Sequence, residues 1–522
     1  MNGAQSVLLA VGLGILSIVL SALGRRLPIP TAILQVLGGL LVGLAPGASA
    51  LRVSPDLVFF VFLPPVLWAA AFFTSFRDFK ANLRPIGLLA IGLVIATTFA
   101  VAVAARYLLP GIPWAAAVAL GAIVSPPDAV AAEAILKRLP IPRRVVSVLL
   151  GESLVNDASA LILYRGAVGA IVAGAFSPGE LVVRFFVDAI VGILLGLLVG
   201  WLIVWAARRT DDALAETALT LVGPYLAWIA GEYLHVSAVL ACVAGGIYLR
   251  QHFSTIVAPA SRIQSRAVWD LFLFGLNSLV FLLLGAEFGN LLETVPAATL
   301  RSVGVSGLAI AGLAILVRLI WVPLGTAIPR WLSPRLRARD PMPPPAAIFV
   351  VSWTSMRGMV SLAAALALPL VTPFRPEIVL ITVTVIMVTL VLQGLTLMPL
   401  FSRLHFPPDP APGLEESHAR AEAHRTALEQ LADLADEPWV KREDLERMES
   451  DLHAAHRVKA EGSSTRAGET YRRLRLATVR AKRGALVRLR DEGAISDDVL
   501  LDLESELDYE ALRLGAGDER DR

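Results

Sequence analysis

Four polar residues stand out in this chain because they interrupt long apolar stretches. They fall in GAIVSPPDAVAAEAIL (121–136) and LLGESLVNDASALIL (149–163), and they are Asp128, Glu152, Asn156 and Asp157. Each stretch is apolar enough to lie in a lipid bilayer, where an ionisable group costs at least ~2.5–3.5 kcal/mol on insertion scales. We therefore expect a functional polar centre inside a membrane, with the rest of the chain built around it.

The composition is that of a membrane protein with a charged tail. The 522 residues are 56% hydrophobic with a mean hydropathy of +0.67, too apolar for a soluble globular chain of this size. Half of the charged residues, 45 of 90, lie in residues 411–522. We predict a transmembrane domain over 1–404 and a cytosolic tail of charged helices over 405–522. Neither a nucleic-acid partner nor a cofactor is expected, and the single cysteine rules out an intramolecular disulfide.

Apolar runs of spanning length predict about thirteen transmembrane helices. They fall at roughly 6–23, 30–45, 56–73, 85–108, 112–136, 144–175, 181–205, 214–232, 235–251, 266–289, 301–329, 345–369 and 374–401. With the N-terminus outside, most Lys and Arg residues of the short loops fall on the inner side. Because positive residues stay cytoplasmic, this alternation predicts a cytoplasmic C-terminus.

Two of these spans are interrupted at corresponding places. An arrangement of two inverted six-helix repeats joined by the seventh span pairs span five with span twelve. Pro126 and Pro127 break span five, and SWTSMRGMVS places Arg357 in the middle of span twelve. Interrupted helices at matching positions of two halves are the sequence signal of a transporter's binding site. The predicted fold is an all-α polytopic membrane protein with interrupted helices.

Helical geometry sorts the polar residues by face and depth. Ser153 and Asp157 share one face of span six, and Glu152 lies on the next. At ~1.5 Å per residue, Glu152 and Arg318 both lie ~10 Å from the inner edge, so we predict a buried structural ion pair between them. Arg357 falls at the depth of Asp157, where it is expected either to tune the charges of the core or to hold the interrupted helix together.

Asp157 and Asp128 are then the candidate functional carboxylates. A carboxylate in a water-filled cavity at mid-membrane can hold a small cation or a proton, and the two compete. Ser153 can add an oxygen ligand, and backbone carbonyls freed by Pro126 and Pro127 can add others. The expected cation ligands are Asp157 and Ser153.

These motifs resemble those of the monovalent cation:proton antiporter-1 family, the bacterial and eukaryotic Na⁺/H⁺ exchangers. The likeness covers about residues 5–405 and is carried by SPPDAVA, GESLVND, Arg318 and MRGMVSLAAALALP. It implies a 13-helix homodimer, an elevator-like movement of a core domain and electroneutral exchange. It also implies that Asp157 binds the ion and the proton, with Asn156 as its partner and Ser153 as a ligand.

The same resemblance assigns Glu152 and Arg318 to a stabilising ion pair and Arg357 to a core arginine. Two positions depart from the family pattern. Pro127 stands where the family often has a threonine, and Ala69 stands where many bacterial members have an acidic residue. A missing carboxylate changes cation choice or affinity, so the preference among Na⁺, K⁺ and Li⁺ stays open.

The leading functional hypothesis is secondary antiport of a monovalent cation, with Na⁺ expected first, against H⁺. Its setting is the plasma membrane of a bacterium, and the chain is not expected to be an enzyme. Two alternatives use the same residues. The first is an ion channel or sensor, but the sequence shows no repeated selectivity-filter segment. The second is an intramembrane aspartyl protease, but the sequence lacks the Gly-x-Gly-Asp context of such enzymes.

Overall fold

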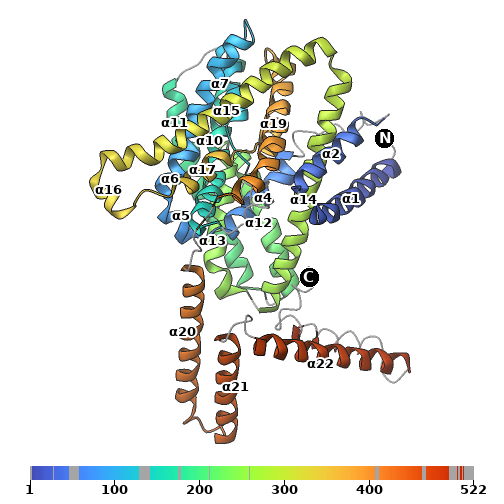
Figure 1. The fold of residues 1–522 in the computed structure, drawn as a ribbon, viewed down its shortest axis with the longest axis vertical. Coiled ribbons are helices and arrows are strands. Elements are labelled where there is room, and N and C mark those ends of the chain that lie inside the picture. The colour runs from blue at the N-terminus through green and yellow to red at the C-terminus, as the bar shows by residue number, and fades with distance from the viewer. Residues whose placement is uncertain are drawn as a thin grey trace. The chain divides into compact units, whose positions relative to one another are not determined.

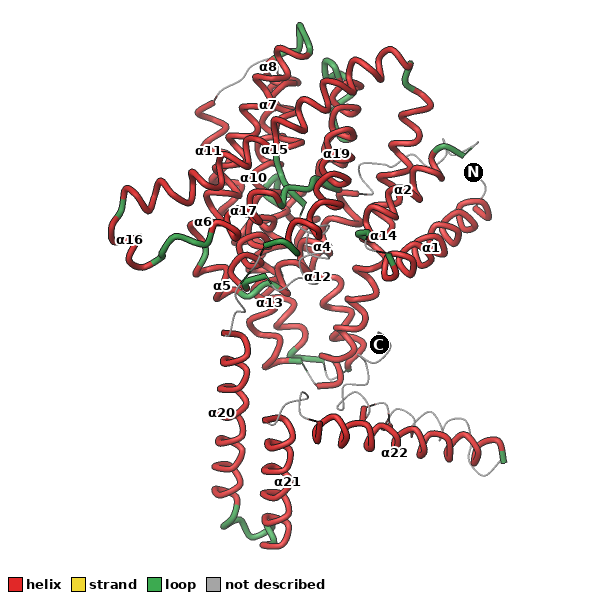
Figure 2. The backbone as a smooth tube through the Cα atoms, viewed as in Figure 1, coloured by secondary structure: helices red, strands yellow, loops and turns green. Residues whose placement is uncertain are grey.

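In the computed structural model, helices joined by loops and turns make up the described residues, with no strand among them (Figure 2). The described residues are 3–27, 29–45, 58–128, 141–173, 178–210, 212–257, 259–404, 406, 411–460, 466–492, 503, 506–507 and 509–510. They form two compact units, Met1–Pro408 and Asp409–Arg522. The all-α class predicted from the sequence is therefore confirmed.

The first unit is a bundle of helices, most of them apolar (Figure 1). In chain order they are α1 (Gly3–Arg26), α2 (Thr31–Gly43), η2 (Val58–Phe62), α4 (Leu63–Phe73), α5 (Phe76–Ala81), α6 (Leu83–Gly87), η3 (Leu88–Leu93), α7 (Val94–Leu108), α8 (Trp114–Val124), α10 (Arg143–Ala173), α11 (Pro178–Ala207), α12 (Ala213–Tyr233), α13 (Ala238–Ile256), α14 (Pro259–Thr294), α15 (Ala297–Leu332), α16 (Pro334–Arg339), α17 (Pro345–Trp353), α18 (Met359–Leu366) and α19 (Arg375–Phe401).

Seven stretches of the described chain are long and apolar enough to cross a membrane by themselves. They are Leu83–Leu108, Arg143–Ala173, Val183–Ala207, Ala213–Tyr233, Ser261–Glu293, Thr299–Leu332 and Arg375–Phe401. Shorter apolar helices accompany them, and each predicted span overlaps at least one helix. The multi-pass architecture is confirmed, while the count of thirteen stays a prediction.

The two predicted helix interruptions differ in how they end. α8 stops at Val124, and Ser125–Asp128 continue without helical structure. Residues 129–140, which complete predicted span five, lie outside the described residues. α17 ends at Trp353 and α18 begins at Met359, so 354–358 are non-helical in the middle of predicted span twelve. Both breaks fall where the sequence predicted them.

Small residues let some of these helices pack backbone against backbone. A Cβ atom added to Gly39 on α2 would lie 2.0 Å from the Leu282 carbonyl oxygen of α14. One added to Gly285 would lie 2.0 Å from the Val36 carbonyl oxygen. Such close approach is how membrane helices gain van der Waals contact when lipid removes the hydrophobic drive between them. The α2–α14 contact is therefore tightly fitted.

The second unit consists of charged helices, as the sequence predicted for the tail. They are α20 (Ala411–Leu434), α21 (Arg442–Ala460) and α22 (Arg466–Asp491). α20 packs against α21, with the rings of His424 and His453 at a centroid distance of 5.1 Å. The buried side chains Leu476 and Val479 give α22 an apolar face.

Candidate ion-binding site

The two interrupted segments meet and bond to each other, and the place where they meet is called the crossing. The backbone N–H of Asp128, after α8, donates to the Met356 carbonyl at 2.6 Å. In return, Nε of Arg357, before α18, donates to the Val124 carbonyl at 3.0 Å. Backbone polar groups of non-helical chain at membrane depth must form their hydrogen bonds inside the protein. Here each interrupted segment supplies a donor to a backbone carbonyl of the other. The crossing therefore holds non-helical chain in a defined position at the centre of the bundle.

α10 passes this crossing and binds it through Asn156. This side chain is fully buried, and its Nδ2 donates to the Pro127 carbonyl at 3.0 Å. α10 packs against α8 and α18, so the helix that carries Asp157 is fixed to both interrupted segments. The Oδ1 atom of Asn156 has no hydrogen-bond partner among the described residues.

A cavity of about 50 Å³, named the ion cavity, opens where the crossing meets α10 and α4. Three of the four predicted ion-site residues line it, namely Asp128, Ser153 and Asp157. Asn156 does not line it but holds the Pro127 carbonyl behind it. Because a single water needs only ~10–15 Å³ of such space, the cavity has room for a cation and a few waters.

The carboxylate of Asp157 faces this cavity without a protein partner. Its side chain is only 7% exposed, yet within the described part of the chain it forms no hydrogen bond and no ion pair. Asp128 lies close enough for the two charges to interact. A buried carboxylate without a countercharge calls for a bound cation or a proton.

Glu152 and Arg318 meet in a different environment, one to two turns along α10 from Asp157. Both are about 1% exposed, and the Arg318 Nη2 lies 2.7 Å from Glu152 Oε2 while Nη1 contacts Oε1. Arg318 Nε also donates to the Val351 carbonyl, 3.0 Å away, which is one of the last carbonyls of α17. The pair is bidentate and dry, and it ties α10, α15 and α17 together.

Arg357 uses its guanidinium to hold backbone. Besides the bond to Val124, Nη1 contacts both the carbonyl and the hydroxyl of Ser355. Its own N–H donates to Oγ1 of Thr389 on α19, 3.1 Å away. The contacts thus favour the structural reading of this residue, in which it fastens the interrupted helix, alongside any effect of its charge on the core.

Sequence reasoning overlooked three residues of the site. Gly358 packs directly against Asp128, since a Cβ atom there would lie 1.7 Å from Oδ2. Ser361 lines the cavity, and its buried hydroxyl has no partner among the described residues. Thr74 on the α4 side also lines it. Gly358 follows the core residue Arg357, and that position was a usable sequence signal of close packing. No sequence signal pointed to the hydroxyl groups of Ser361 and Thr74.

The two departures from the family pattern have different positions. Pro127 lines the cavity, and its carbonyl accepts the Asn156 hydrogen bond. Ala69 does not line it; the side that carries Ala69 faces a separate cavity with Trp68 and Phe72, while the next residue, Ala70, lines the ion cavity. The missing carboxylate at position 69 therefore removes no group from the cavity that holds Asp157.

A polytopic helical bundle with two interrupted helices bonded to each other and with buried carboxylates is typical of an ion-coupled membrane transporter. The chain belongs to the sodium/hydrogen exchanger family, whose transmembrane region matches residues 13–403. The resemblance of its motifs to those of Na⁺/H⁺ exchangers is thereby confirmed. Members of this family are transporters rather than enzymes.

Relatives with similar sequences are also named as Na⁺/H⁺ exchangers or cation/H⁺ antiporters. An uncharacterized Na⁺/H⁺ exchanger of Mycobacterium tuberculosis is 34% identical over 511 residues, covering 95% of this chain and 93% of the relative. A sodium, potassium, lithium and rubidium/H⁺ antiporter of Bacillus pumilus is 33% identical over 391 residues, covering 72% and 58% of the two chains. The first of these likenesses extends through the tail.

A solved structure shares the fold. The sodium proton antiporter MjNhaP1 from Methanocaldococcus jannaschii superposes with a TM-score of 0.62 at 18% identity, covering 78% of this chain and all of that one. The overall helical fold is thus shared with that protein.

Proposed function

We propose that this protein exchanges a monovalent cation, Na⁺ first, for H⁺ by alternate occupation of Asp157. The observation that carries the proposal is the partnerless Asp157 carboxylate on a cavity that it shares with Asp128 and Ser153. Family membership supports the same direction. The structure contributes a reason why one site serves both ions, because nothing in the described protein neutralises Asp157 permanently.

Competition at one carboxylate couples the two fluxes. A proton and a cation both neutralise Asp157, so binding one releases the other. Changing the open side of the cavity with a bare buried charge is costly, whereas changing it with either ion bound is not. Exchange of one cation for one proton follows, and it moves no net charge across the membrane.

The proposed coordination uses hard oxygen atoms. Asp157 and Ser153 supply ligands from α10, Asp128 supplies a second carboxylate, and Ser361 adds a hydroxyl that has no other partner in the described chain. Asn156 is proposed to act indirectly by fixing the Pro127 carbonyl. Water completes the shell in a cavity of this size.

Cation choice is proposed to be broader than Na⁺ alone. The relative from Bacillus pumilus is named for sodium, potassium, lithium and rubidium, and one from Aphanothece halophytica is named a Na⁺/H⁺ antiporter. Because Ala69 lies outside the ion cavity, its departure from the family pattern leaves the ligands in place. We expect Na⁺ and Li⁺ to be exchanged, with K⁺ as the comparison that sets selectivity.

The proposed setting is a bacterial plasma membrane, with the N-terminus outside and the tail from residue 405 in the cytoplasm. Arg84, Arg144 and Arg330 come from three loops predicted to be cytoplasmic, and all three contact Asp340. These loops therefore meet at one end of the bundle, which supports the predicted orientation. A homodimer with residues 1–404 as the exchanger domain is proposed on the resemblance to the family.

The test is exchange in everted vesicles that hold a pH gradient. Addition of Na⁺ or Li⁺ to vesicles with the wild-type protein is expected to dissipate the gradient, and Asp157→Asn is expected to abolish the response. Glu216→Gln is the matched control, because Glu216 on α12 is equally buried, at 5% exposure, and lines no part of the ion cavity.

Two outcomes would overturn the proposal. Full exchange by Asp157→Asn would remove the carboxylate from the mechanism. Conductance far above transporter turnover in a planar bilayer would make the protein a channel.

A further inference from the structure

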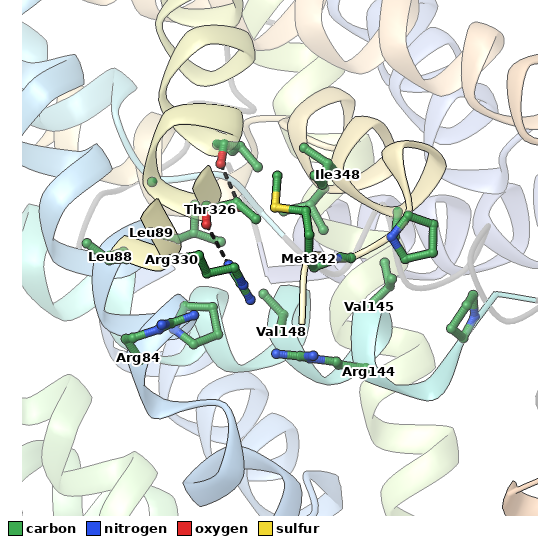
Figure 3. Close-up of a pocket in the computed structure, with 18 of the residues that line it drawn as sticks. Arg84, Leu88, Leu89, Arg144, Val145, Val148, Thr326, Arg330, Met342 and Ile348 are labelled. Carbon is green, nitrogen blue, oxygen red and sulfur yellow. Dashed lines mark hydrogen bonds between the residues drawn. The ribbon is translucent and has the colours of Figure 1, made fainter. Parts of the chain in front are cut away.

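A second and larger cavity, of about 320 Å³, lies at the Arg-rich end of the first unit. It is enclosed by α6 and η3, the start of α10, the second half of α15 and the segment before α17 (Figure 3). It shares no lining residue with the ion cavity. Its volume is at the lower end of the range for ligand pockets, ~300–1,000 Å³.

One side of this cavity is cationic. Figure 3 shows Arg84, Arg144 and Arg330 converging there from three elements. All three bond to Asp340, at 2.8, 2.7 and 2.7 Å respectively. One carboxylate against three guanidinium groups leaves a net positive charge. In addition, Nη1 of Arg84 is buried and has no hydrogen-bond partner among the described residues. The cluster has donors to spare for an anion.

The rest of the cavity is apolar. Its lining consists mainly of aliphatic and aromatic side chains, which include Leu88, Leu89, Val145, Val148, Trp321, Met342 and Ile348. The indole N–H of Trp321 donates a hydrogen bond to the Leu88 carbonyl, 3.0 Å away, so the ring presents only carbon atoms to the cavity. Such a lining accepts a hydrocarbon chain and offers little to a fully polar ligand.

The outer surface around the cavity fits the boundary of a bilayer. At the end of α15, Ile328, Trp331 and Leu332 are exposed, Trp331 at 80%. The following α16 exposes Arg335, Arg337 and Arg339. Exposed tryptophan and apolar residues beside a basic cluster are typical of helices at the membrane–water interface, where basic residues attract anionic lipid headgroups.

We propose that this cavity binds an anionic phospholipid of the bilayer. Its phosphate is held by Arg84, Arg144 and Arg330, and the first part of one acyl chain enters the apolar space between η3, α10 and α15. This site is separate from the ion cavity and does not depend on the proposed antiport. Because α10 and α15, two of the elements that the lipid would contact, also carry the Glu152–Arg318 pair, occupancy stabilises the part of the protein that supports the ion site.

The test uses the full-length protein purified in detergent. Its thermal stability and lipid adducts in native mass spectrometry are measured with dioleoyl phosphatidylglycerol, dioleoyl phosphatidylcholine or inorganic phosphate. Phosphatidylglycerol is expected to raise the melting temperature and to remain bound, whereas the other two are not. Phosphatidylcholine has the same chains without net charge, and inorganic phosphate has the charge without chains.

Two variants separate the parts of the site. Gly325→Leu fills the cavity, and a Cβ there meets nothing closer than 3.9 Å, so the helix tolerates the change. Arg144→Gln removes one phosphate donor and is expected to weaken phosphatidylglycerol binding by about tenfold, the value of a charge-assisted hydrogen bond. Arg337→Gln, on α16 outside the cavity, is the matched control and is expected to bind as the wild type does.

Each contrary outcome overturns the proposal. Equal stabilisation by phosphatidylcholine would remove the role of the arginines. An equal shift with inorganic phosphate alone would make the cluster a free-anion site. Unchanged phosphatidylglycerol binding by both Gly325→Leu and Arg144→Gln would mean that the lipid binds elsewhere.

Discussion

Glu152 and Asp157, two carboxylates little more than one turn apart on α10, differ in whether the protein supplies a countercharge. Glu152 is held by both Nη atoms of Arg318 in a dry, fully packed setting. Asp157 faces a cavity with no protein countercharge in the described chain. The same helix thus carries one acid that is paired within the protein and one that has no protein countercharge in the described chain, which we propose is neutralised by the transported ion.

This contrast shows how a membrane protein separates structure from transport. Burying a charge costs several kcal/mol, and the cost is met by a partner that either stays or leaves. At Glu152 the partner is part of the chain and cannot leave. At Asp157 the partner is proposed to be the substrate, so neutralisation and transport are the same event.

Removing Arg318, the partner of Glu152 within the chain, should have the largest effect on stability. Arg318→Met leaves Glu152 buried without a countercharge and the Val351 carbonyl without its donor. We expect a loss of about 3–5 kcal/mol, as for other broken buried pairs. Thermal stability in detergent measures it. Asp157→Asn should leave stability unchanged or raise it, and equal losses in the two variants would contradict the contrast.

Asn156→Ala tests whether the crossing depends on α10. It removes the only donor to the Pro127 carbonyl among the described residues and leaves that buried group unsatisfied, which costs about 1–3 kcal/mol. A lower melting temperature together with slower exchange is expected. Ser159→Ala is the control on the same helix, since within the described chain its hydroxyl donates only to the Val155 carbonyl one turn back. Similar effects of the two variants would remove the special role of Asn156.

Gly358→Ala tests the position of Asp128 without touching its charge. The added Cβ would lie 1.7 Å from Oδ2, so the Asp128 carboxylate must move away from its place at the cavity. Exchange is expected to fall by about tenfold or more, because a displacement near 1 Å is enough to disturb a preorganised site. Vesicle assays measure it, with Gly312→Ala on α15 as control, because a Cβ added there meets nothing within 4 Å and the residue lines neither cavity. Normal exchange by Gly358→Ala would show that Asp128 need not be held there.

The smallest expected effect concerns Asp340. Burial alone would raise the pKa of its carboxyl, but the hydrogen bonds and charges of Arg144 and Arg330 outweigh burial and lower the pKa. A lowered folded-state pKa means a stabilising contribution that is present above the unfolded pKa, near 3.9, and is lost as the pH falls through the folded value. Asp340→Asn should therefore be slightly less stable than the wild type at pH 7.

The pH dependence provides the check on that prediction. The stability difference between Asp340→Asn and the wild type should shrink as the pH falls below about 4, where Asp340 itself becomes protonated. Thermal unfolding at several pH values measures it. A difference that grows in acid would have the wrong sign.

Much of this architecture could be predicted from hydropathy and proline positions. Pro126 and Pro127 mark the end of α8, and the polar run around Arg357 marks the gap between α17 and α18, because neither sequence can continue a helix in lipid. Depth along the helices also brought Glu152 and Arg318 to the same level, where the structure joins them. These features depend on local chemistry and on the rise of a helix.

Features that depend on the crossing itself could not be predicted in this way. The bond from Asn156 to Pro127 and the contact of Gly358 with Asp128 require knowing how two non-helical segments approach each other. The same holds for Ala69, whose neighbour Ala70, rather than Ala69 itself, lines the ion cavity. Sequence spacing fixes neighbours within a helix but not which side of a short helix meets a distant loop.

Proton release on Na⁺ binding tests the central claim most directly. Purified protein in weakly buffered solution is mixed with NaCl, and choline chloride serves as the control for ionic strength. If Asp157 holds either a proton or the cation, the wild type should release protons on adding Na⁺, up to about one per bound ion, and Asp157→Asn should release none. Undiminished release from Asp157→Asn, or saturable Na⁺ binding by the wild type without release at any pH, would contradict it.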